Sequence, residues 1–170
     1  MKGENLKMRN IKIVLIYIML CMNLYAIKAK VIKVSDGDTI ISIIDKKKVK
    51  IRMFGIDAPE KTQDYGSDSQ KYLERAILNK VIDVKVIEKD QYGRTVGKVF
   101  YKNEDINLKM IETGNAWHYR KLAPKEKTYF NAEKKAKKSK IGLWRKKALA
   151  PWQYRYNQKN KNRNKSKKYS

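Results

Sequence analysis

Five charged residues stand out because they border or interrupt stretches that otherwise have the pattern of β-strands. Three are carboxylates, Asp38, Asp57 and Glu60, and two are guanidiniums, Arg52 and Arg94. Carboxylates that lie close together repel each other unless a positive charge sits between them, and a hard cation with oxygen ligands meets that need. A third carboxylate can orient or deprotonate a water, and guanidiniums can stabilise charge on a phosphoryl group. The set therefore predicts metal-assisted hydrolysis of a phosphodiester.

The first cluster, VSDGDTI at residues 34–40, also has a purely structural interpretation. Asp36-Gly37 is a common signal for a tight hairpin, so the stretch could be only a turn between two strands. Asp38 is harder to explain in this way, because it opens the next strand, where aspartate is usually disfavoured. The turn and a metal-binding role for Asp38 are compatible.

The other two clusters are ambiguous when each is taken alone. In RMFGIDAPE, the pair Ala58-Pro59 stiffens the turn between Asp57 and Glu60 and fixes their relative direction, although a solvated loop would have the same pattern. In DQYGR, residues 90–94, a turn places an arginine next to a tyrosine, which is common on protein surfaces. The hydrolytic interpretation depends on all three clusters meeting in space.

The elements that must position these clusters follow from hydrophobic periodicity. Alternating apolar and polar residues predict five strands, at 29–35, 38–44, 48–54, 81–88 and 95–101. Short strands separated by turns favour a small closed barrel over a parallel sheet. Helical spacing predicts three α-helices within 67–80, 104–116 and 124–144, the first with a capping box at Ser67 and Gln70. The expected fold class is α+β.

The charge balance indicates the kind of partner. The chain of 170 residues has 41 Lys and Arg against 17 Asp and Glu, for a net charge of +24. Such an excess attracts polyanions, either nucleic acid or acidic lipid, although a general lysine bias of the proteome would also produce it. With one Cys and one His, the chain has no Cys/His zinc cluster and no histidine pair for a nucleophile–base relay.

The two ends of the chain differ from the middle. Residues 1–26 combine a basic start, an apolar run from Ile13 to Met22 and a small residue at Ala26, as in a secretory signal peptide. The apolar run is shorter than the roughly 20 residues of a membrane span, and an uncleaved anchor is the alternative. Cleavage would give a secreted or periplasmic protein. Residues 153–170 are cationic without apolar periodicity and are expected to be a basic disordered tail.

The order and spacing of the motifs resemble the staphylococcal nuclease (thermonuclease) family. The resemblance extends from about Lys30 to Trp152, most of a domain at 27–152. VSDGDTI resembles the family's Asp-Gly-Asp-Thr turn, IRMFGIDAPE its Arg-x-x-x-x-Asp-x-Pro-Glu element, and DQYGR its Asp-x-Tyr-Gly-Arg turn. YGSDSQKYLERAI resembles its first helix, and IGLW and APWQYR resemble its C-terminal segment.

This resemblance implies an OB-fold barrel of five strands with three α-helices. It also implies Ca²⁺-dependent cleavage of DNA and RNA that leaves 3′-phosphate ends. Asp38 and Asp57 match the metal-binding carboxylates, Ala58 matches a residue that offers its backbone carbonyl to the metal, and Asp36 matches a second acidic residue near it.

The resemblance assigns roles to the remaining candidates too. Glu60 matches the residue that either deprotonates the attacking water or only positions it, and Arg52 and Arg94 match the phosphate-binding arginines. Tyr92 and Tyr119 are candidates for nucleotide contact. His118, next to Tyr119, is a less favoured candidate for a catalytic acid, because a single histidine beside aromatic residues is more often packed.

Two non-enzymatic interpretations compete with the nuclease. A nucleic-acid-binding OB-fold module would explain the charge, but carboxylates that face a phosphate would weaken its binding by repulsion. A cationic membrane-active protein would explain the lysine-rich C-terminal part, and weak association with anionic membranes is expected as a secondary property. The expected nuclease is a monomer.

Overall fold

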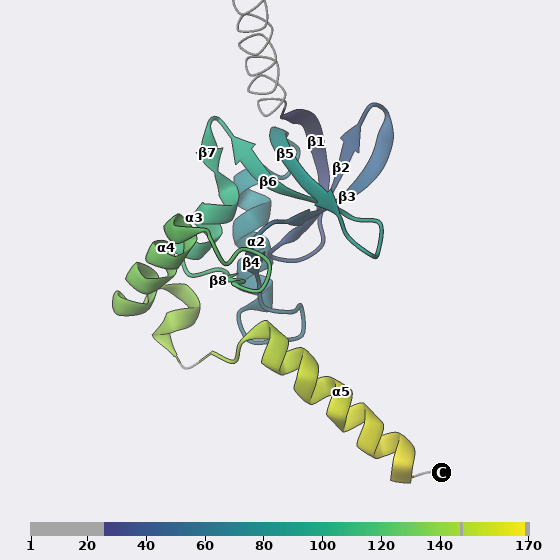
Figure 1. The fold of residues 1–170 in the computed structure, drawn as a ribbon, viewed down its shortest axis with the longest axis vertical. Coiled ribbons are helices and arrows are strands. Elements are labelled where there is room, and N and C mark those ends of the chain that lie inside the picture. The colour runs from purple at the N-terminus through teal and green to yellow at the C-terminus, as the bar shows by residue number, and fades with distance from the viewer. Residues whose placement is uncertain (1–25, 147, 169–170) are drawn as a thin grey trace, which may run out of the picture.

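The computed structural model describes residues 26–146 and 148–168, which form a β-barrel flanked by helices (Figure 1). The expected signal peptide lies outside the described residues, apart from Ala26. Among the helices of the described residues, none is long and apolar enough to cross a membrane.

Five strands form the closed barrel that the alternating pattern predicts. They are β1 (Ile27–Val34), β2 (Thr39–Ile44), β3 (Lys47–Met53), β5 (Val81–Lys89) and β6 (Thr95–Tyr101). They follow one another in the order β3-β2-β1-β5-β6 with antiparallel neighbours, and a parallel pairing of β3 with β6 closes the sheet. The expected α+β fold with a five-stranded barrel is confirmed.

Apolar side chains from the five strands fill the interior of the barrel. Five side chains from the five strands are fully buried in one core cluster: Val31, Ile40, Ile51, Ile82 and Val99. Burying a side chain of this size stabilises the fold by roughly 1.5–3 kcal/mol. Asn107 ties the closing edge together, because its amide donates to the carbonyls of Phe54 (2.9 Å) and Gly97 (3.3 Å).

The three predicted helices are present as α2 (Gly66–Ile77), α3 (Ile106–Glu112) and α4 (Lys127–Lys138). The predicted capping box of α2 is wrong, because the helix begins at Gly66 and Tyr65 occupies the cap without a side-chain hydrogen bond. Gly66 is needed for space, since a Cβ there would collide with the carbonyl oxygen of Glu60. Three short strands complete the middle of the chain: β4 (Ile56–Asp57), β7 (Glu104–Asp105) and β8 (Trp117–His118).

The C-terminal part differs from the expected disordered tail. After a 3-10 turn, η1 (Gly142–Arg145), the described chain has a fourth α-helix, α5 (Pro151–Lys168), which extends away from the barrel (Figure 1). Proline favours the first turn of a helix, and the Lys, Arg and Gln residues that follow are good helix formers. Contacts of its first turns with the rest of the protein also hold it, as described below.

Candidate active site

One cleft of about 680 Å³ collects the predicted site residues. Its walls are the β1–β2 loop, the ends of β3 and β4, the loop that follows β4, and the β5–β6 turn. All nine candidates line it: Asp36, Asp38, Arg52, Asp57, Ala58, Glu60, Tyr92, Arg94 and Tyr119. The clusters that were ambiguous alone therefore meet in space.

The β1–β2 loop presents Asp38 through an unexpected backbone geometry. The Asp38 amide donates to Asp36 Oδ1 at 3.0 Å, which holds the loop between the strands. The left-handed glycine of a tight Asp-Gly hairpin is not found, because Gly37 is not among the glycines with positive φ. A Cβ on Gly37 would instead collide with Ser69 Oγ and lie 2.6 Å from Ala58 Cβ. Gly37 therefore permits close packing rather than a tight reversal.

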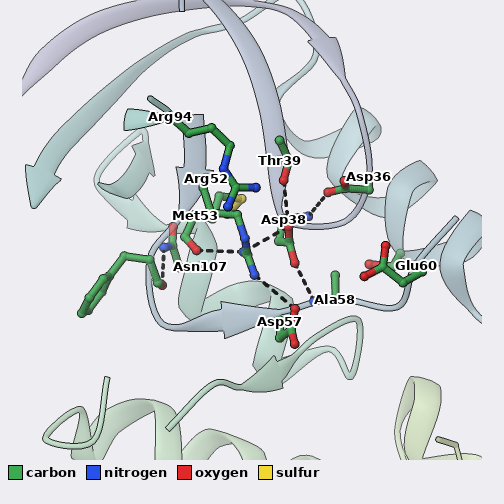
Figure 2. A network of polar contacts seen from close by, with 12 residues as sticks. Asp36, Asp38, Thr39, Arg52, Met53, Asp57, Ala58, Glu60, Arg94 and Asn107 are labelled. Atoms are coloured by element: carbon green, nitrogen blue, oxygen red, sulfur yellow. Dashed lines mark hydrogen bonds and ion pairs between the residues drawn. The ribbon is translucent and has the colours of Figure 1, made fainter. Parts of the chain in front are cut away.

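Arg52 bridges the two predicted metal-binding carboxylates (Figure 2). Its Nη1 lies 3.0 Å from Asp38 Oδ1 and its Nη2 lies 3.1 Å from Asp57 Oδ1. All three residues are buried, and Asp57 is only 1% exposed. Pairing β4 with β8 sets the backbone of Asp57 opposite that of Trp117. A buried carboxylate needs such a partner, because an uncompensated buried charge is strongly destabilising.

The second oxygen of Asp38 contacts the loop after β4. Asp38 Oδ2 accepts the amide hydrogen of Ala58 at 2.7 Å, and Thr39 Oγ1 donates to Oδ1 at 2.9 Å. The contact of Ala58 with Asp38 is thus through its amide. The predicted role of the Ala58 carbonyl as a metal ligand stays a prediction.

Glu60 projects from a short turn beside these carboxylates (Figure 2). Gln63 fixes this turn from both ends, since its amide donates to the Glu60 carbonyl (2.8 Å) and its Oε1 accepts from the Glu60 amide (3.2 Å). The side chain of Glu60 is 37% exposed, in contrast to the buried aspartates. A partly exposed carboxylate at the cleft wall has access to a water molecule.

The β5–β6 turn orients Arg94 through Asp90, a residue that the sequence analysis gave no role. Asp90 Oδ1 accepts the amides of Tyr92 (3.0 Å) and Arg94 (2.9 Å), and Asp90 Oδ2 lies 2.7 Å from Arg94 Nε. Burial opposes the charge of Asp90, but these hydrogen bonds outweigh it and lower its pKa. Gly93 has the positive φ of 75° that the predicted turn requires. Arg94 and Arg52 line the same cleft.

The aromatic candidates line the cleft, whereas the histidine does not. Tyr92 is 74% exposed, with the Arg94 guanidinium carbon 5.5 Å from its ring centre. The ring of Tyr119 lies 5.9 Å from that of Trp152. His118 is buried, and its Nε2 lies 2.8 Å from the carbonyl oxygen of Ala123. The less favoured role of His118 as a catalytic acid gains no support from this placement.

Burial shifts the ionisation of two acidic residues in the cleft. Burial, and then the charge of Asp38, raise the pKa of Asp36 from the ordinary 3.8 to about 6. Burial also raises the pKa of Asp57, although a hydrogen bond from Arg155 opposes this shift. The cleft concentrates negative charge that is costly to keep without a cation.

Exchanging Asp36 for Asn should remove one of the buried negative charges that destabilise the metal-free protein. Asp36 holds its proton more tightly in the folded chain than in the unfolded chain, so its contribution to stability falls as the pH rises from about 4 through about 6. In EDTA at pH 7 we expect Asp36→Asn to be more stable than wild type by about 1–3 kcal/mol, with the difference vanishing near pH 4. Urea denaturation at the two pH values measures this, and Asp64→Asn, at an exposed site, is the control. Equal stability at pH 7 would contradict the shifted pKa.

The chemistry of the donors suits a hard cation. Within residues 26–146 and 148–168, no three His, Cys, Asp or Glu side chains form a ready-made metal cluster. The cleft instead offers two buried carboxylates, with Glu60 beside them, and oxygen ligands of this kind are those that Ca²⁺ prefers. In the structure, arginines neutralise these carboxylates. The residues therefore fit such an ion if one of the arginines moves away from the carboxylate oxygens.

One of these arginines, Arg155, is a residue that the sequence analysis missed. It belongs to α5, and its guanidinium contacts both Asp57 and Glu60 from across the cleft. The motif APWQYR was noted for its resemblance only, without a chemical role. The expected disorder of residues 153–170 left Arg155 unassigned.

Comparisons with known proteins show which proteins the chain resembles. The family model described as "Staphylococcal nuclease homologue" matches residues 50–146, which include every candidate except Asp36 and Asp38. An "Uncharacterized endonuclease" of Haemophilus influenzae is 38% identical over 116 residues, covering 68% of this chain and 65% of that protein. A "Micrococcal nuclease" of Shigella flexneri is 32% identical over 139 residues, covering 75% and 80%. An "Uncharacterized endonuclease" of Escherichia coli is 34% identical over 132 residues, covering 76% and 86%.

Proposed function

Because the chain belongs to the staphylococcal nuclease family and is a hydrolytic nuclease, we propose that it is a Ca²⁺-dependent endonuclease that cleaves DNA and RNA and leaves 3′-phosphate ends. The observation that carries this proposal is the convergence of three carboxylates and two arginines from separate chain segments in one cleft. Neither a phosphate-binding surface nor a structural turn needs that combination.

The buried carboxylates of Asp38 and Asp57 would hold the Ca²⁺ ion, with the Ala58 carbonyl as a further ligand and Asp36 nearby. When bound, the ion supplies a Lewis acid that polarises a phosphoryl oxygen. Arg52 contacts the carboxylate of Asp57, and the Ala58 amide donates to that of Asp38, so both carboxylates are oriented before any ligand arrives. Such preorganisation lowers the cost of assembling the site.

The remaining residues act on the water and the phosphate. Glu60, partly exposed at the cleft wall, deprotonates the attacking water or orients it. The water oxygen bonds to phosphorus, and the bond from phosphorus to the 5′ oxygen breaks. That oxygen takes up a proton from solvent and leaves as a 5′ hydroxyl, so the phosphate stays on the 3′ side. Arg52 and Arg94 face the charge that builds up on the phosphoryl oxygens. Asp90 positions Arg94 for this role.

Charge and aromatic residues support nucleic acid as the substrate. The net charge of +24 attracts a polyanion without regard to sequence. Tyr92 and Tyr119, which line the cleft, would contact nucleotides next to the cleavage point by stacking or by hydrogen bonds. A non-catalytic binding module is disfavoured, since it would gain nothing from the carboxylates.

We also propose a cellular setting from the two ends of the chain. The basic start and short apolar run of residues 1–26 support export through a signal peptide, with an uncleaved anchor as the alternative. The lysine-rich α5 supports weak adsorption to anionic membranes as a secondary property. The enzyme is proposed to act as a monomer.

Chelation tests the proposed metal dependence. We expect purified protein to cut DNA and RNA in Ca²⁺ and to lose at least about a hundredfold in rate in EDTA, because the phosphoryl charge loses its Lewis acid. Gel analysis measures cleavage, and sensitivity of the product ends to a 3′-phosphatase identifies them. Excess Ca²⁺ added after EDTA is the control and should restore the rate. Undiminished cleavage in EDTA would remove the metal roles of Asp38 and Asp57.

A further inference from the structure

Arg155 occupies the side of the carboxylate cluster that Arg52 leaves open. Its Nη2 lies 2.8 Å from Asp57 Oδ2, and its Nη1 lies 2.7 Å from Glu60 Oε1 and 3.3 Å from Asp57 Oδ1. Arg52 contacts only the Oδ1 atom of Asp57. Every carboxylate oxygen of Asp57 and Asp38 therefore has a hydrogen-bond donor in this state of the protein.

A cation that binds Asp57 must displace one of these donors, and Arg155 is the one that can leave. The side chain of Arg52 is 11% exposed, and its Nη1 also donates to the Met53 carbonyl at 3.1 Å. The side chain of Arg155 is 45% exposed, so it can turn toward water without unfolding its helix. Asp57, at 1% exposed, has no comparable freedom and depends on whichever positive group faces it.

The charge balance of the cluster also favours such an exchange. Asp38, Asp57 and Glu60 are the carboxylates that Arg52 and Arg155 contact, and against the single charge of Arg52 they leave two negative charges in excess. Arg155 compensates half of the excess on these three residues, whereas a divalent cation in its place would compensate all of it. The Arg155 guanidinium and a divalent cation would thus compensate the same negative charge, and they cannot both bind the same carboxylate oxygens.

The first turns of α5 are seated on the loop that carries Glu60, which explains how Arg155 reaches the cluster. Tyr154 Oη lies 3.0 Å from Thr62 Oγ1, and the Gln63 side-chain amide donates to the Leu149 carbonyl. Trp152 packs edge-to-face against Trp117, with ring centres 6.4 Å apart. These contacts involve none of the ion-paired side chains and place Arg155 at the cleft.

We propose that Arg155 is a built-in competitor of the divalent cation, so that its contacts with Asp57 and Glu60 set the affinity of the site for Ca²⁺. The inference rests on the Ca²⁺ site proposed above and extends it. In the metal-free protein Arg155 contacts Asp57 and Glu60 and compensates part of their negative charge. When Ca²⁺ binds, Arg155 is released from Asp57 toward the open cleft, where its charge becomes available to the polyanionic substrate.

Isothermal titration of metal-free protein with Ca²⁺ measures the competition directly. We expect Arg155→Gln to bind Ca²⁺ on the order of tenfold more tightly than wild type, because the hydrogen bonds to charged groups that the cation must break are lost. Lys159→Gln is the matched control: it removes the same charge from an exposed site one turn along α5 and should stay within about twofold of wild type. Arg155→Lys keeps the positive charge, but its ammonium lacks the planar set of donors with which the guanidinium contacts both carboxylates. We expect its affinity for Ca²⁺ to rise by less than that of Arg155→Gln.

Thermal unfolding gives a second measurement that does not depend on activity. In EDTA, Arg155→Gln should melt at a lower temperature than wild type because Asp57 loses a partner, and saturating Ca²⁺ should raise its melting temperature by more than it raises that of wild type. Equal or weaker Ca²⁺ binding by Arg155→Gln, with binding by wild type intact, would overturn the competition alone. If neither protein bound Ca²⁺, the proposed metal site would fail as well. If Lys159→Gln gained as much Ca²⁺ affinity as Arg155→Gln, the loss of one positive charge anywhere on α5 would explain the result, and the proposed competition would also be overturned.

Discussion

We expect Glu60→Gln to lower kcat for DNA cleavage by a factor on the order of 10²–10⁴, while the protein stays folded. Glutamine has nearly the shape of glutamate, but it neither accepts a proton nor holds a water with a full negative charge. The turn around residue 60 should persist, because Gln63 holds it through the backbone of Glu60 and not through its side chain. Single-turnover cleavage in saturating Ca²⁺ measures the loss.

A lower cleavage rate of Glu60→Gln could also come from a loss of folded protein or of bound Ca²⁺. Melting curves and Ca²⁺ titration of the same Glu60→Gln preparation check both, and Glu112→Gln, at an exposed position at the end of α3, is the matched control with wild-type activity. The pH profile would add information, since loss of a general base flattens its acidic limb. A Gln variant that cuts as fast as wild type would refute the assignment of Glu60.

Arg52→Gln is expected to lower the free energy of unfolding at pH 7 by about 3–5 kcal/mol, the cost of removing one partner of a buried ion pair. Two carboxylates, Asp38 and Asp57, would lose the guanidinium that lies between them. The loss should be smaller near pH 4, because protonation of Asp57, whose pKa burial already raises, removes the uncompensated charge. Urea denaturation in EDTA at the two pH values measures both effects.

The control for this variant is a surface pair of the same kind. Lys28 lies 2.7 Å from Asp83, but its side chain is 72% exposed, and Lys28→Gln should cost less than about 1 kcal/mol. In saturating Ca²⁺ we also expect Arg52→Gln to cut DNA more slowly by a factor on the order of 10² or more, because a donor to the phosphoryl oxygens is lost. Wild-type stability of Arg52→Gln would show that the bridge contributes little.

The barrel could be predicted from the sequence because its determinants are local. The period-two patterning predicted the strands, and residues such as Ile40 and Ile51 are fully buried in the barrel, although both faces are buried where β3 and β6 pair. The fold that closes these strands was implied by the resemblance, which rests on motifs that recur in order. The roles of Asp38, Asp57 and Glu60 came from the same source, and their meeting in one cleft agrees with it.

The features that could not be predicted depend on contacts between residues far apart in the sequence or on the close packing of the folded chain. No local pattern links Arg155 to Asp57, 98 residues earlier in the chain, and α5 has no apolar period that would predict docking. Gly37 was expected to form a tight turn, but its role depends on Ser69, which only the folded chain brings close. Asp90 was overlooked because an acidic residue in a turn has an ordinary explanation, and its bond to Arg94 becomes visible only in the folded turn.

The parallel pairing of β3 with β6 has a consequence for how activity arises during folding. It consists of three residue pairs, and one of them sets Arg52 opposite Val96, two residues from Arg94. Until these edges meet, the two arginines proposed to face the phosphate belong to opposite margins of an open sheet. If they act together as proposed, a chain that has formed every strand but not the β3–β6 pairing would be inactive. Recovery of cleavage during refolding would therefore report the closure of the barrel.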